Sequence, residues 1–179
     1  MTDELEDQMI AKAEGLEAGD KGAEAIAEAT ELVQIDPKDA LVWFVKGKAH
    51  YVEREFEEAY ASFSKSAEIE RENPKVWQMM GYCLLSLNQY SDAEKCLDYV
   101  KAAEPANIEA VCALGISQVL QNKPQDARRN FDLALSMNKQ TTCNVLEHFY
   151  ENVFSASKDT SSTAKALLER VLETIKLVR

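Results

Sequence analysis

The chain has 179 residues, of which 46% are hydrophobic and 28% are charged, with six glycines and four prolines. This composition excludes a disordered or collagen-like chain and favours one compact domain or a short array of repeats. The 31 acidic residues outnumber the 20 lysines and arginines, which gives a formal net charge of −11. Such an acidic excess argues against binding to nucleic acids or anionic membranes through a general basic field.

Most of this acidity lies at the N-terminal end. Residues 1–40 hold twelve acidic residues and three lysines, which accounts for −9 of the net charge. We interpret this segment as a terminal element with a solvated acidic face, and a docking face for a basic partner is the alternative. A secretory signal would begin with basic residues, and uncharged runs such as 110–122 are too short to cross a bilayer. We therefore expect a cytoplasmic protein that enters no membrane.

Small and bulky residues recur through the middle of the chain at one constant interval. Within each unit a bulky residue is followed by a glycine, then an alanine, then a second bulky residue, always at the same spacing. This order predicts two helices per unit, packed as a hairpin. The four columns are Trp43, Trp77 and Val111; Gly47, Gly81 and Gly115; Ala59, Ala93 and Ala127; and Phe63, Leu97 and Phe131.

A glycine inside a helix costs about 1 kcal/mol relative to alanine, so its recurrence needs a packing reason. We expect each recurring glycine to let the backbone of a second helix approach closely. The alanine should do the same from the other side, and the bulky residues should fill the space around both contacts.

Polar residues mark the expected helix ends. Breaks at 53–55 and 88–89 separate the two helices of a hairpin. A proline at the first helical position, preceded by a capping Asp or Asn, is typical of a helix start. The segments Asp36-Pro37, Asn73-Pro74 and Glu104-Pro105 therefore predict the boundaries between hairpins, and Ser91 with Glu94 has the spacing of a capping box.

These motifs and their interval resemble the tetratricopeptide repeat family, whose repeat is about 34 residues long. The family's closing proline is matched by Pro37 and Pro105, whereas Pro74 lies three residues beyond its expected position, which predicts a longer second helix or an altered turn. The three clear copies read Trp43-x-x-Lys46-Gly47-x-x-His50 with Ala59-x-x-x-Phe63; Trp77-x-x-Met80-Gly81-x-x-Leu84 with Ala93-x-x-x-Leu97; and Val111-x-x-Leu114-Gly115-x-x-Gln118 with Ala127-x-x-x-Phe131.

The resemblance implies an all-α fold, a right-handed α-solenoid of about five stacked hairpins with ten helices. We expect a single repeat domain over residues 1–179. Residues 6–39 form a degenerate acidic first repeat, and residues 142–179 form a divergent capping hairpin with a long amphipathic C-terminal helix. That helix could instead occupy the concave channel or dock on another copy of the chain. The three clear repeats are 40–73, 74–107 and 108–141.

Little in the sequence points to catalysis, a cofactor or a metal. The two histidines, His50 and His148, lie in different repeats, and we expect His50 to be packed where the family has an aromatic residue. The glycines near the N-terminus follow no strand and lack the partners of a phosphate-binding loop. The cysteines lack the close pairs of a zinc or redox motif, so we expect them to be reduced and buried: Cys83, Cys96, Cys112 and Cys143.

In the family, the first helix of each hairpin lines a concave channel that binds peptides. The residues of this chain at the corresponding positions are mostly apolar and aromatic. Such a channel suits an amphipathic helix or an extended segment of a partner protein. The alternative is that these residues are ordinary core between neighbouring first helices. The candidate residues are Phe44, Val45, Lys48, Tyr51, Lys75, Gln78, Met79, Tyr82, Cys112, Ile116, Val119, Leu146 and Tyr150.

Family members that hold the acidic C-terminal tails of heat-shock chaperones use lysine, arginine and asparagine side chains at fixed channel positions. In one register those positions hold Ile10 and Glu14, then Val45, then Lys75 and Met79. In the other register they hold Phe44 and Lys48, then Met79, then Glu109 and Ala113. Neither set matches, so we predict against this partner. A homodimer formed through the terminal repeats is the alternative to peptide binding.

Overall fold

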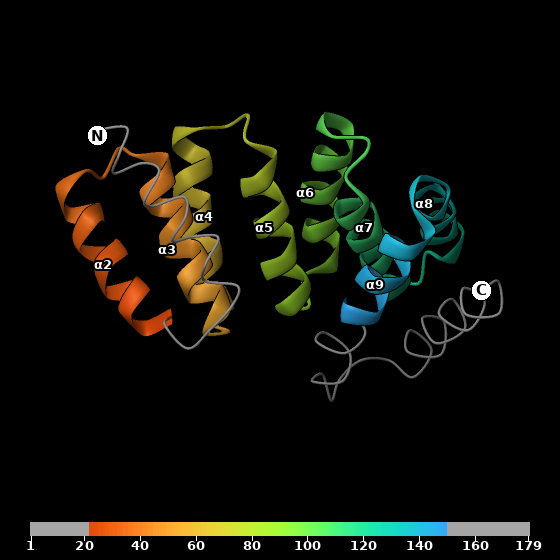
Figure 1. Ribbon diagram of the computed structural model, residues 1–179, viewed down its shortest axis with the longest axis horizontal. Coiled ribbons are helices and arrows are strands. Elements are labelled where there is room, and N and C mark those ends of the chain that lie inside the picture. The colour runs from red at the N-terminus through yellow and green to blue at the C-terminus, as the bar shows by residue number, and fades with distance from the viewer. Residues whose placement is uncertain (1–21, 150–179) are drawn as a thin grey trace. The chain divides into compact units, whose positions relative to one another are not determined.

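The computed structural model describes residues 22–149, and all regular structure in that range is α-helical (Figure 1). The chain divides into a first unit, residues 1–87, and a second unit, residues 88–179. The first unit holds α2 (Gly22–Ile35), α3 (Ala40–Val52), α4 (Phe56–Ile69) and α5 (Pro74–Ser86). The second holds α6 (Tyr90–Ala103), α7 (Ile108–Leu120), α8 (Pro124–Met137) and α9 (Lys139–Phe149). The expected all-α fold is confirmed, and the outermost of the ten expected helices lie outside the described residues.

The helices follow the period of the sequence. The first helices α3, α5 and α7 begin at residues 40, 74 and 108, and the second helices α4, α6 and α8 begin at residues 56, 90 and 124. The second helices all have 14 residues, so the longer second helix before Pro74 is not formed. Among the described helices, this repeat interval changes only at α9, which begins at Lys139. A single residue, Asn138, separates α9 from α8, and its Oδ1 accepts a hydrogen bond from the Thr141 N–H at 3.0 Å.

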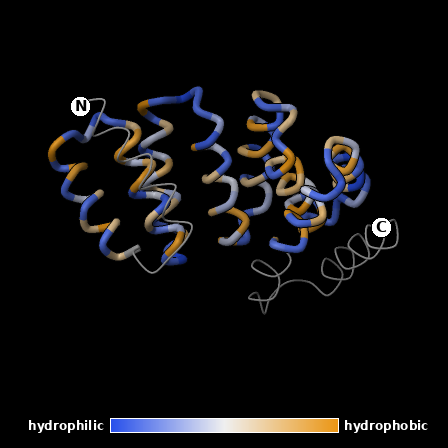
Figure 2. Tube along the Cα trace, in the orientation of Figure 1, coloured by the Kyte–Doolittle hydropathy of each residue, from blue (hydrophilic) through white to orange (hydrophobic). Residues whose placement is uncertain are grey.

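In the first unit, helices that are consecutive in the chain pack against one another, and α3 also contacts α5. Small residues let α2 approach α3: Ala25 packs with Ala49, and Ala29 packs with Val42 and Val45. The hydrophobic residues that make such contacts recur between hydrophilic ones along each helix (Figure 2). The core of this unit therefore lies between helices that carry one apolar stripe each.

In the second unit, α7 is the central helix. It packs against α6, α8 and α9, and its residues 110–119 are all buried. The uncharged run noted in the sequence is thus a helix surrounded by other helices, which explains why it lacks the polar face of a surface helix. Among the described helices, none combines the length and hydrophobicity that a bilayer-spanning segment needs.

A residue with positive φ closes each turn within a hairpin. Arg54, Asn88 and Asn122 have φ of 62°, 61° and 59° and occupy the same position in successive repeats. In the turn after α3, the N–H of Glu55 donates to the His50 carbonyl at 2.9 Å and the N–H of Arg54 donates to the Tyr51 carbonyl at 3.1 Å. This is the Schellman arrangement, in which one left-handed residue lets the last carbonyls of a helix find donors.

The turns between hairpins begin helices by side-chain capping. Asn73 caps α5 and Pro74 occupies its first turn, as predicted. Pro37 and Pro105 do not start helices, because Asp39 and Asn107 are the caps of α3 and α7 and both prolines lie earlier in the turn. Asp39 Oδ1 accepts from the Leu41 N–H at 2.8 Å, which satisfies a donor at the start of the helix that has no partner within it.

The expected capping box at Ser91 and Glu94 is wrong. Helix α6 begins at Tyr90, one residue before Ser91, and its cap Gln89 makes no side-chain capping bond. Ser91 therefore lies inside the helix. The Glu94 carboxylate is instead hydrogen-bonded to Gln118, Gln121 and Lys123, which lie farther along the chain.

The recurring tryptophans have a polar role as well as a packing one. The indole N–H of Trp43 donates to the Pro37 carbonyl at 3.0 Å, and that of Trp77 donates to the Arg71 carbonyl at 2.8 Å. Both acceptors lie upstream, in the turn before the helix. Each tryptophan thus ties its first helix to the preceding turn, which Val111 in the third copy is unable to do because its side chain has no donor.

Candidate functional site

The structure sorts the predicted channel residues by exposure. In the first unit, Lys75 is exposed, and Phe44, Tyr51, Gln78, Met79 and Tyr82 are half-buried. The remaining described members are buried: Val45, Lys48, Cys112, Ile116, Val119 and Leu146. Tyr150 lies outside the described residues. The accessible part of the predicted channel is therefore on α3 and α5, whereas its members on α7 and α9 are interior residues.

The accessible residues form two stripes on neighbouring helices. Phe44 and Tyr51, with the buried Lys48 between them, lie at helical spacing along α3, and Lys75, Gln78 and Tyr82 do so along α5. Phe44 and Lys48 occupy the same repeat positions as Gln78 and Tyr82. Since α3 also contacts α5, the two stripes are equivalent faces of neighbouring first helices. We call these six residues the α3/α5 face.

Aromatic contacts hold the α3 half of this face in place. The Phe44 ring lies 5.6 Å from that of Phe63, and the Tyr51 ring meets that of Phe56 edge-on at 5.5 Å. Burial raises the pKa of Tyr51 to about 12, and neighbouring Cys83 of α5 adds to the shift. Tyr51 therefore stays a neutral phenol at neutral pH and links the two helices.

On α5, the side chains of Gln78 and Tyr82 are hydrogen-bonded to each other. Gln78 Nε2 donates to the Tyr82 hydroxyl at 2.7 Å, one helical turn away. This hydrogen bond fixes the orientation of two half-buried polar groups on the face. Hydrogen-bonding groups that are already oriented in this way can recognise a ligand backbone with little additional ordering cost.

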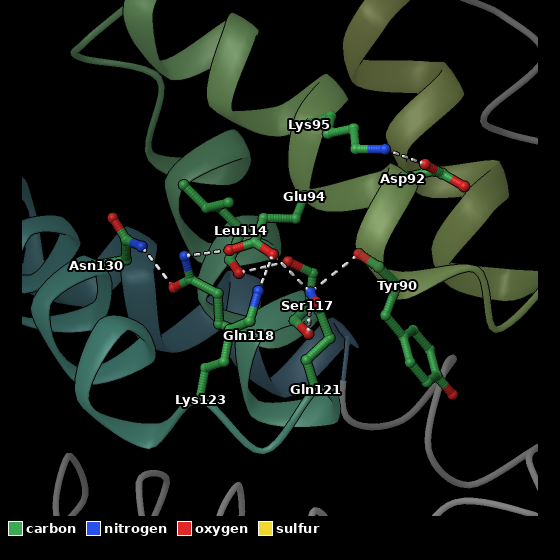
Figure 3. A network of polar contacts seen from close by, with 10 residues as sticks. All are labelled: Tyr90, Asp92, Glu94, Lys95, Leu114, Ser117, Gln118, Gln121, Lys123 and Asn130. Atoms are coloured by element: carbon green, nitrogen blue, oxygen red, sulfur yellow. Dashed lines mark hydrogen bonds and ion pairs between the residues drawn. The ribbon is translucent and has the colours of Figure 1, made fainter.

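A second group of polar residues, in the second unit, was not predicted from the sequence (Figure 3). Glu94 of α6 accepts from Gln118 Nε2 at 3.1 Å, Gln121 Nε2 at 2.8 Å and Lys123 Nζ at 2.6 Å. Burial alone would raise the pKa of Glu94, but these three hydrogen bonds and the charge of Lys123 outweigh it, so the pKa lies below its ordinary value.

The network continues into α8. Asn130 Nδ2 donates to Gln118 Oε1 at 2.8 Å, and Lys101 Nζ of α6 donates to Asn130 Oδ1 at 2.7 Å. Gln118 and Asn130 are only 6% and 4% exposed, and their amides bond to described residues on both sides. We interpret the network as a structural crosslink between α6 and the α7–α8 hairpin. The signal available in the sequence was Gln118, a polar residue at the signature position that holds the apolar Leu84 in the preceding copy.

The remaining groups that could carry chemistry are packed. His50 is 9% exposed and its Nδ1 lies 2.7 Å from Glu55 Oε2, as expected for a packed histidine. All four cysteines are buried and free, and burial raises the pKa of Cys83 and Cys112 to about 12. Within residues 22–149, no group of His, Cys, Asp and Glu side chains is placed to hold a metal.

Comparison with known proteins supports the repeat family. The tetratricopeptide repeat family model matches residues 53–114. A search of curated protein sequences finds no significant match. The family resemblance predicted from the motifs is thus confirmed over the central part of the chain.

Solved structures share the fold. A MamA fragment from Desulfovibrio magneticus RS-1 (41-end) aligns with a TM-score of 0.72 and 21% identity, covering 100% of this chain and 98% of the other. YrrB, a tetratricopeptide repeat protein with an unusual peptide-binding site, aligns with a TM-score of 0.67 and 19% identity, covering 93% and 87%. The first such domain of Spaghetti (RPAP3), bound to the HSP90 peptide SRMEEVD, aligns with a TM-score of 0.56 and 17% identity, covering 80% and 94%. At these identities the similarity concerns the fold.

Proposed function

We propose that this chain, which carries tetratricopeptide repeats, is a non-enzymatic interaction scaffold that binds a peptide or an amphipathic helix of a partner protein. The observation that supports the proposal is the α3/α5 face, where aromatic, amide and ammonium side chains remain accessible next to a packed core. Two proteins of the same fold, YrrB and the Spaghetti domain, are described as peptide-binding. The cytoplasm is the compartment in which we would search for the partner.

The half-buried side chains of this face are suited to anchoring a peptide. Phe44 and Tyr51 are held by aromatic contacts, so they lose little conformational freedom when a ligand packs on them. Met79, which follows Gln78 on α5 and is also half-buried, is flexible and apolar, which lets it adapt to different side chains. Gln78 and Tyr82 add polar groups that can satisfy the backbone of an extended ligand.

The test is capture of partner proteins by the immobilised full chain and by a Tyr82→Glu variant. We expect the variant to lose the partners that the unmodified chain retains, because a carboxylate would replace the phenol at the centre of the face. Tyr99→Glu on α6 makes the same chemical change at a residue that is 37% exposed and is the matched control. Ile116 is fully buried, so a charge there would test folding rather than binding.

Helical circular dichroism and thermal unfolding of both variants establish that they remain folded. Equal capture by the unmodified chain and the folded Tyr82→Glu variant would remove the α3/α5 face from consideration as a binding surface.

The second candidate function is self-association through the terminal repeats. It is favoured by Ile35, which is 78% exposed at the end of α2 in the first repeat. Sedimentation velocity over a range of concentrations tests it, with Ile35→Lys as the disrupting variant. A monomer at every concentration would rule out this function.

A further inference from the structure

Exposed apolar residues recur on the solvent-facing side of the second unit. Tyr99 on α6 and Leu133 on α8 are each 37% exposed and lie one repeat apart at equivalent positions. The equivalent residue of the first unit is Lys65, whose ammonium pairs with Glu68 at 2.7 Å. The second unit thus presents apolar side chains where the first presents an ion pair, and exposed apolar residues that lie close together mark a docking surface.

The two apolar residues lie on neighbouring helices. Lys101 Nζ of α6 donates to Asn130 Oδ1 of α8 at 2.7 Å, which places the two helices side by side. The residue one helical turn after each apolar side chain is small and exposed, so another helix has room to approach. We call four residues the α6/α8 patch: Tyr99, Ala102, Leu133 and Ser136.

The bases near the patch are already paired, and an acid beside it is available. The two bases one turn before the apolar residues form ion pairs at 2.7 and 2.8 Å, Lys95 with Asp92 and Arg129 with Asp126. Asp132, on α8 within the edge of the patch, has a 67% exposed side chain, and its contact with Arg128 Nε is long, at 3.7 Å. Such a pair between exposed side chains contributes little to stability, so Asp132 can accept a base of a docked helix.

The sequence beyond α9 contains a segment that suits this patch, residues 164–179, which lie outside the described residues. At 3.6 residues per turn, apolar residues fall on one face of this segment, and its four bases lie closer to that face than its two acids do. The apolar residues of that face are Ala164, Leu167, Leu168, Val171, Leu172, Ile175 and Val178; the bases are Lys165, Arg170, Lys176 and Arg179; and the acids are Glu169 and Glu173. An amphipathic helix of this kind needs a surface that covers its apolar face.

The other helices of the described second unit offer this segment little apolar surface. Residues 110–119 of α7 are buried, and the exposed positions of α9 are polar, namely Gln140, Asn144 and His148. The patch is within reach, because residues 150–163 span up to about 45 Å when extended, about twice the length of α8. A segment tethered near its docking surface has an effective concentration on the order of millimolar, which favours docking within one chain.

We propose that residues 164–179 dock as a helix on the α6/α8 patch of their own chain. Leu133 is the principal anchor, because Tyr99 also interacts elsewhere within the chain. The exposed Leu133 side chain packs on the apolar face of the segment, the small patch residues let the segment approach closely, and a bordering base pairs with Asp132. The docking uses no residue of the α3/α5 face, so it is independent of the proposed function.

The test is hydrogen–deuterium exchange of the full chain, followed over residues 164–179. We expect the amides of this segment to be protected in the unmodified chain. Leu133→Glu should lower their protection about tenfold, since a carboxylate then faces the apolar side of the segment. Ile69→Glu introduces the same charge at a 44% exposed apolar residue of the first unit and is the matched control. Exchange of the buried α7 amides in the same samples reports whether the second unit stays folded.

Further variants keep the test decisive if Leu133→Glu disturbs folding. Ala102→Glu obstructs the patch at an exposed position where glutamate is a good helix former, and it should release the segment in the same way. Within the segment, Leu168→Glu should lower the protection, whereas Ala166→Glu, on the opposite face of the helix, should leave it unchanged.

The alternative positions of the segment give different results. Equal protection in the unmodified chain and in the folded Leu133→Glu and Ala102→Glu variants would place the segment elsewhere, on α9 or in the channel, and would overturn the proposal. An unprotected segment in the unmodified chain would overturn it as well. Protection that rises with protein concentration would assign the patch to a second copy of the chain and contradict docking within one chain. Tyr99→Glu should release the segment and still retain the partners captured through the α3/α5 face, so the two proposals fail separately.

Discussion

The ring of Phe63 lies where a side chain at Gly47 would begin. A Cβ atom built on Gly47 would lie 2.6 Å from Phe63 Cε1 and 2.7 Å from Cδ1, closer than real Cβ contacts. The same relationship recurs two repeats later, where a Cβ on Gly115 would lie 2.5 Å from Phe131 Cε1. The glycine of the repeat therefore makes room for the bulky residue of the second helix. The expectation that it admits a helix backbone is corrected, since the nearest atoms belong to an aromatic side chain.

We predict that Gly47→Ala destabilises the chain by about 1–3 kcal/mol, the usual cost of overpacking a core. The direction is opposite to that of helix propensity, which would favour alanine by about 1 kcal/mol. Equilibrium unfolding in urea measures the difference. Adding Phe63→Leu should recover part of the loss, because the smaller side chain vacates the space that the new methyl group needs.

The control is Ala61→Gly at an exposed position inside α4, which should cost about 1 kcal/mol through propensity alone. A stabilised Gly47→Ala variant would show that the contact with Phe63 relaxes freely and would contradict the packing role of the glycine.

Gly47 and Phe63 illustrate what the sequence can predict. Their columns, the repeat period and the all-α fold follow from the sequence because each repeat places the same residue types at the same spacing. The sequence does not predict which residue of the second helix contacts the glycine, because this contact depends on the angle between the two helices of a hairpin. A periodicity constrains the position of a residue along each helix and leaves the interhelical geometry open.

The Glu94 network was missed for a different reason. The sequence pattern of Ser91 and Glu94 suggested a local cap, whereas the actual partner Lys123 lies 29 residues away. Contacts at that separation depend on how α6 packs on the following hairpin. A motif as short as a capping box often matches a sequence by chance, so the match does not exclude a tertiary role for its residues.

The predicted channel is accessible on one pair of helices and buried on others. Channel and core positions on a helix differ by one residue, about 100° of rotation, so a helix that its neighbours enclose on every side buries both. Residues 110–119 of α7 are all buried, and Ile116 is consequently as buried as a core residue. How completely its neighbours enclose a helix is a property of the fold that residue spacing alone does not reveal.

The second prediction concerns Arg54, whose φ of 62° is costly for a residue with a Cβ atom. Arg54→Gly should stabilise the chain by about 0.5–1 kcal/mol, because the relief of left-handed strain exceeds the additional entropy that glycine loses on folding. Thermal unfolding measures the change. Arg71→Gly changes an exposed arginine in the turn after α4 and is the control, for which we expect no gain.

The equivalent residues Asn88 and Asn122 already tolerate this conformation, so glycine there should gain less than at Arg54. If Arg54→Gly lowered the melting temperature, backbone strain at this turn would not be the dominant effect of the substitution.

The third prediction concerns the thiols. Burial raises the pKa of Cys83 and Cys112 to about 12 and that of Cys96 to about 11. At pH 8 the thiolate fraction of a group with a pKa of about 12 is roughly one in 10⁴, compared with about a quarter for an ordinary cysteine. Titration with Ellman's reagent should therefore find the native chain unreactive, and denaturant should release all four thiols. A thiol that reacts at once in native buffer would contradict the buried placement.

The last prediction uses the pH dependence of the Glu94 network. Because the pKa of Glu94 lies below its ordinary value of 4.5, its ionised form stabilises the folded chain above that pH. The stabilisation is lost as the pH falls through 4.5 and below the lowered pKa. We expect Glu94→Gln to cost about 1–3 kcal/mol at pH 7, the usual cost of losing a hydrogen bond to a charged group, and less at pH 3. Urea unfolding at a series of pH values measures the difference.

Asp98 supplies the opposite control from the same helix. Burial raises its pKa, and the charge of Glu94 raises it further. Its ionised form is therefore less favoured in the folded chain, so Asp98→Asn should stabilise the chain at pH 7, and this gain should vanish as the pH falls below the ordinary pKa of aspartate. If the two variants showed the same pH dependence, the Glu94 carboxylate would not be held by Lys123, Gln118 and Gln121. The opposite signs follow from the hydrogen bonds that Glu94 receives and from the repulsion that Asp98 experiences.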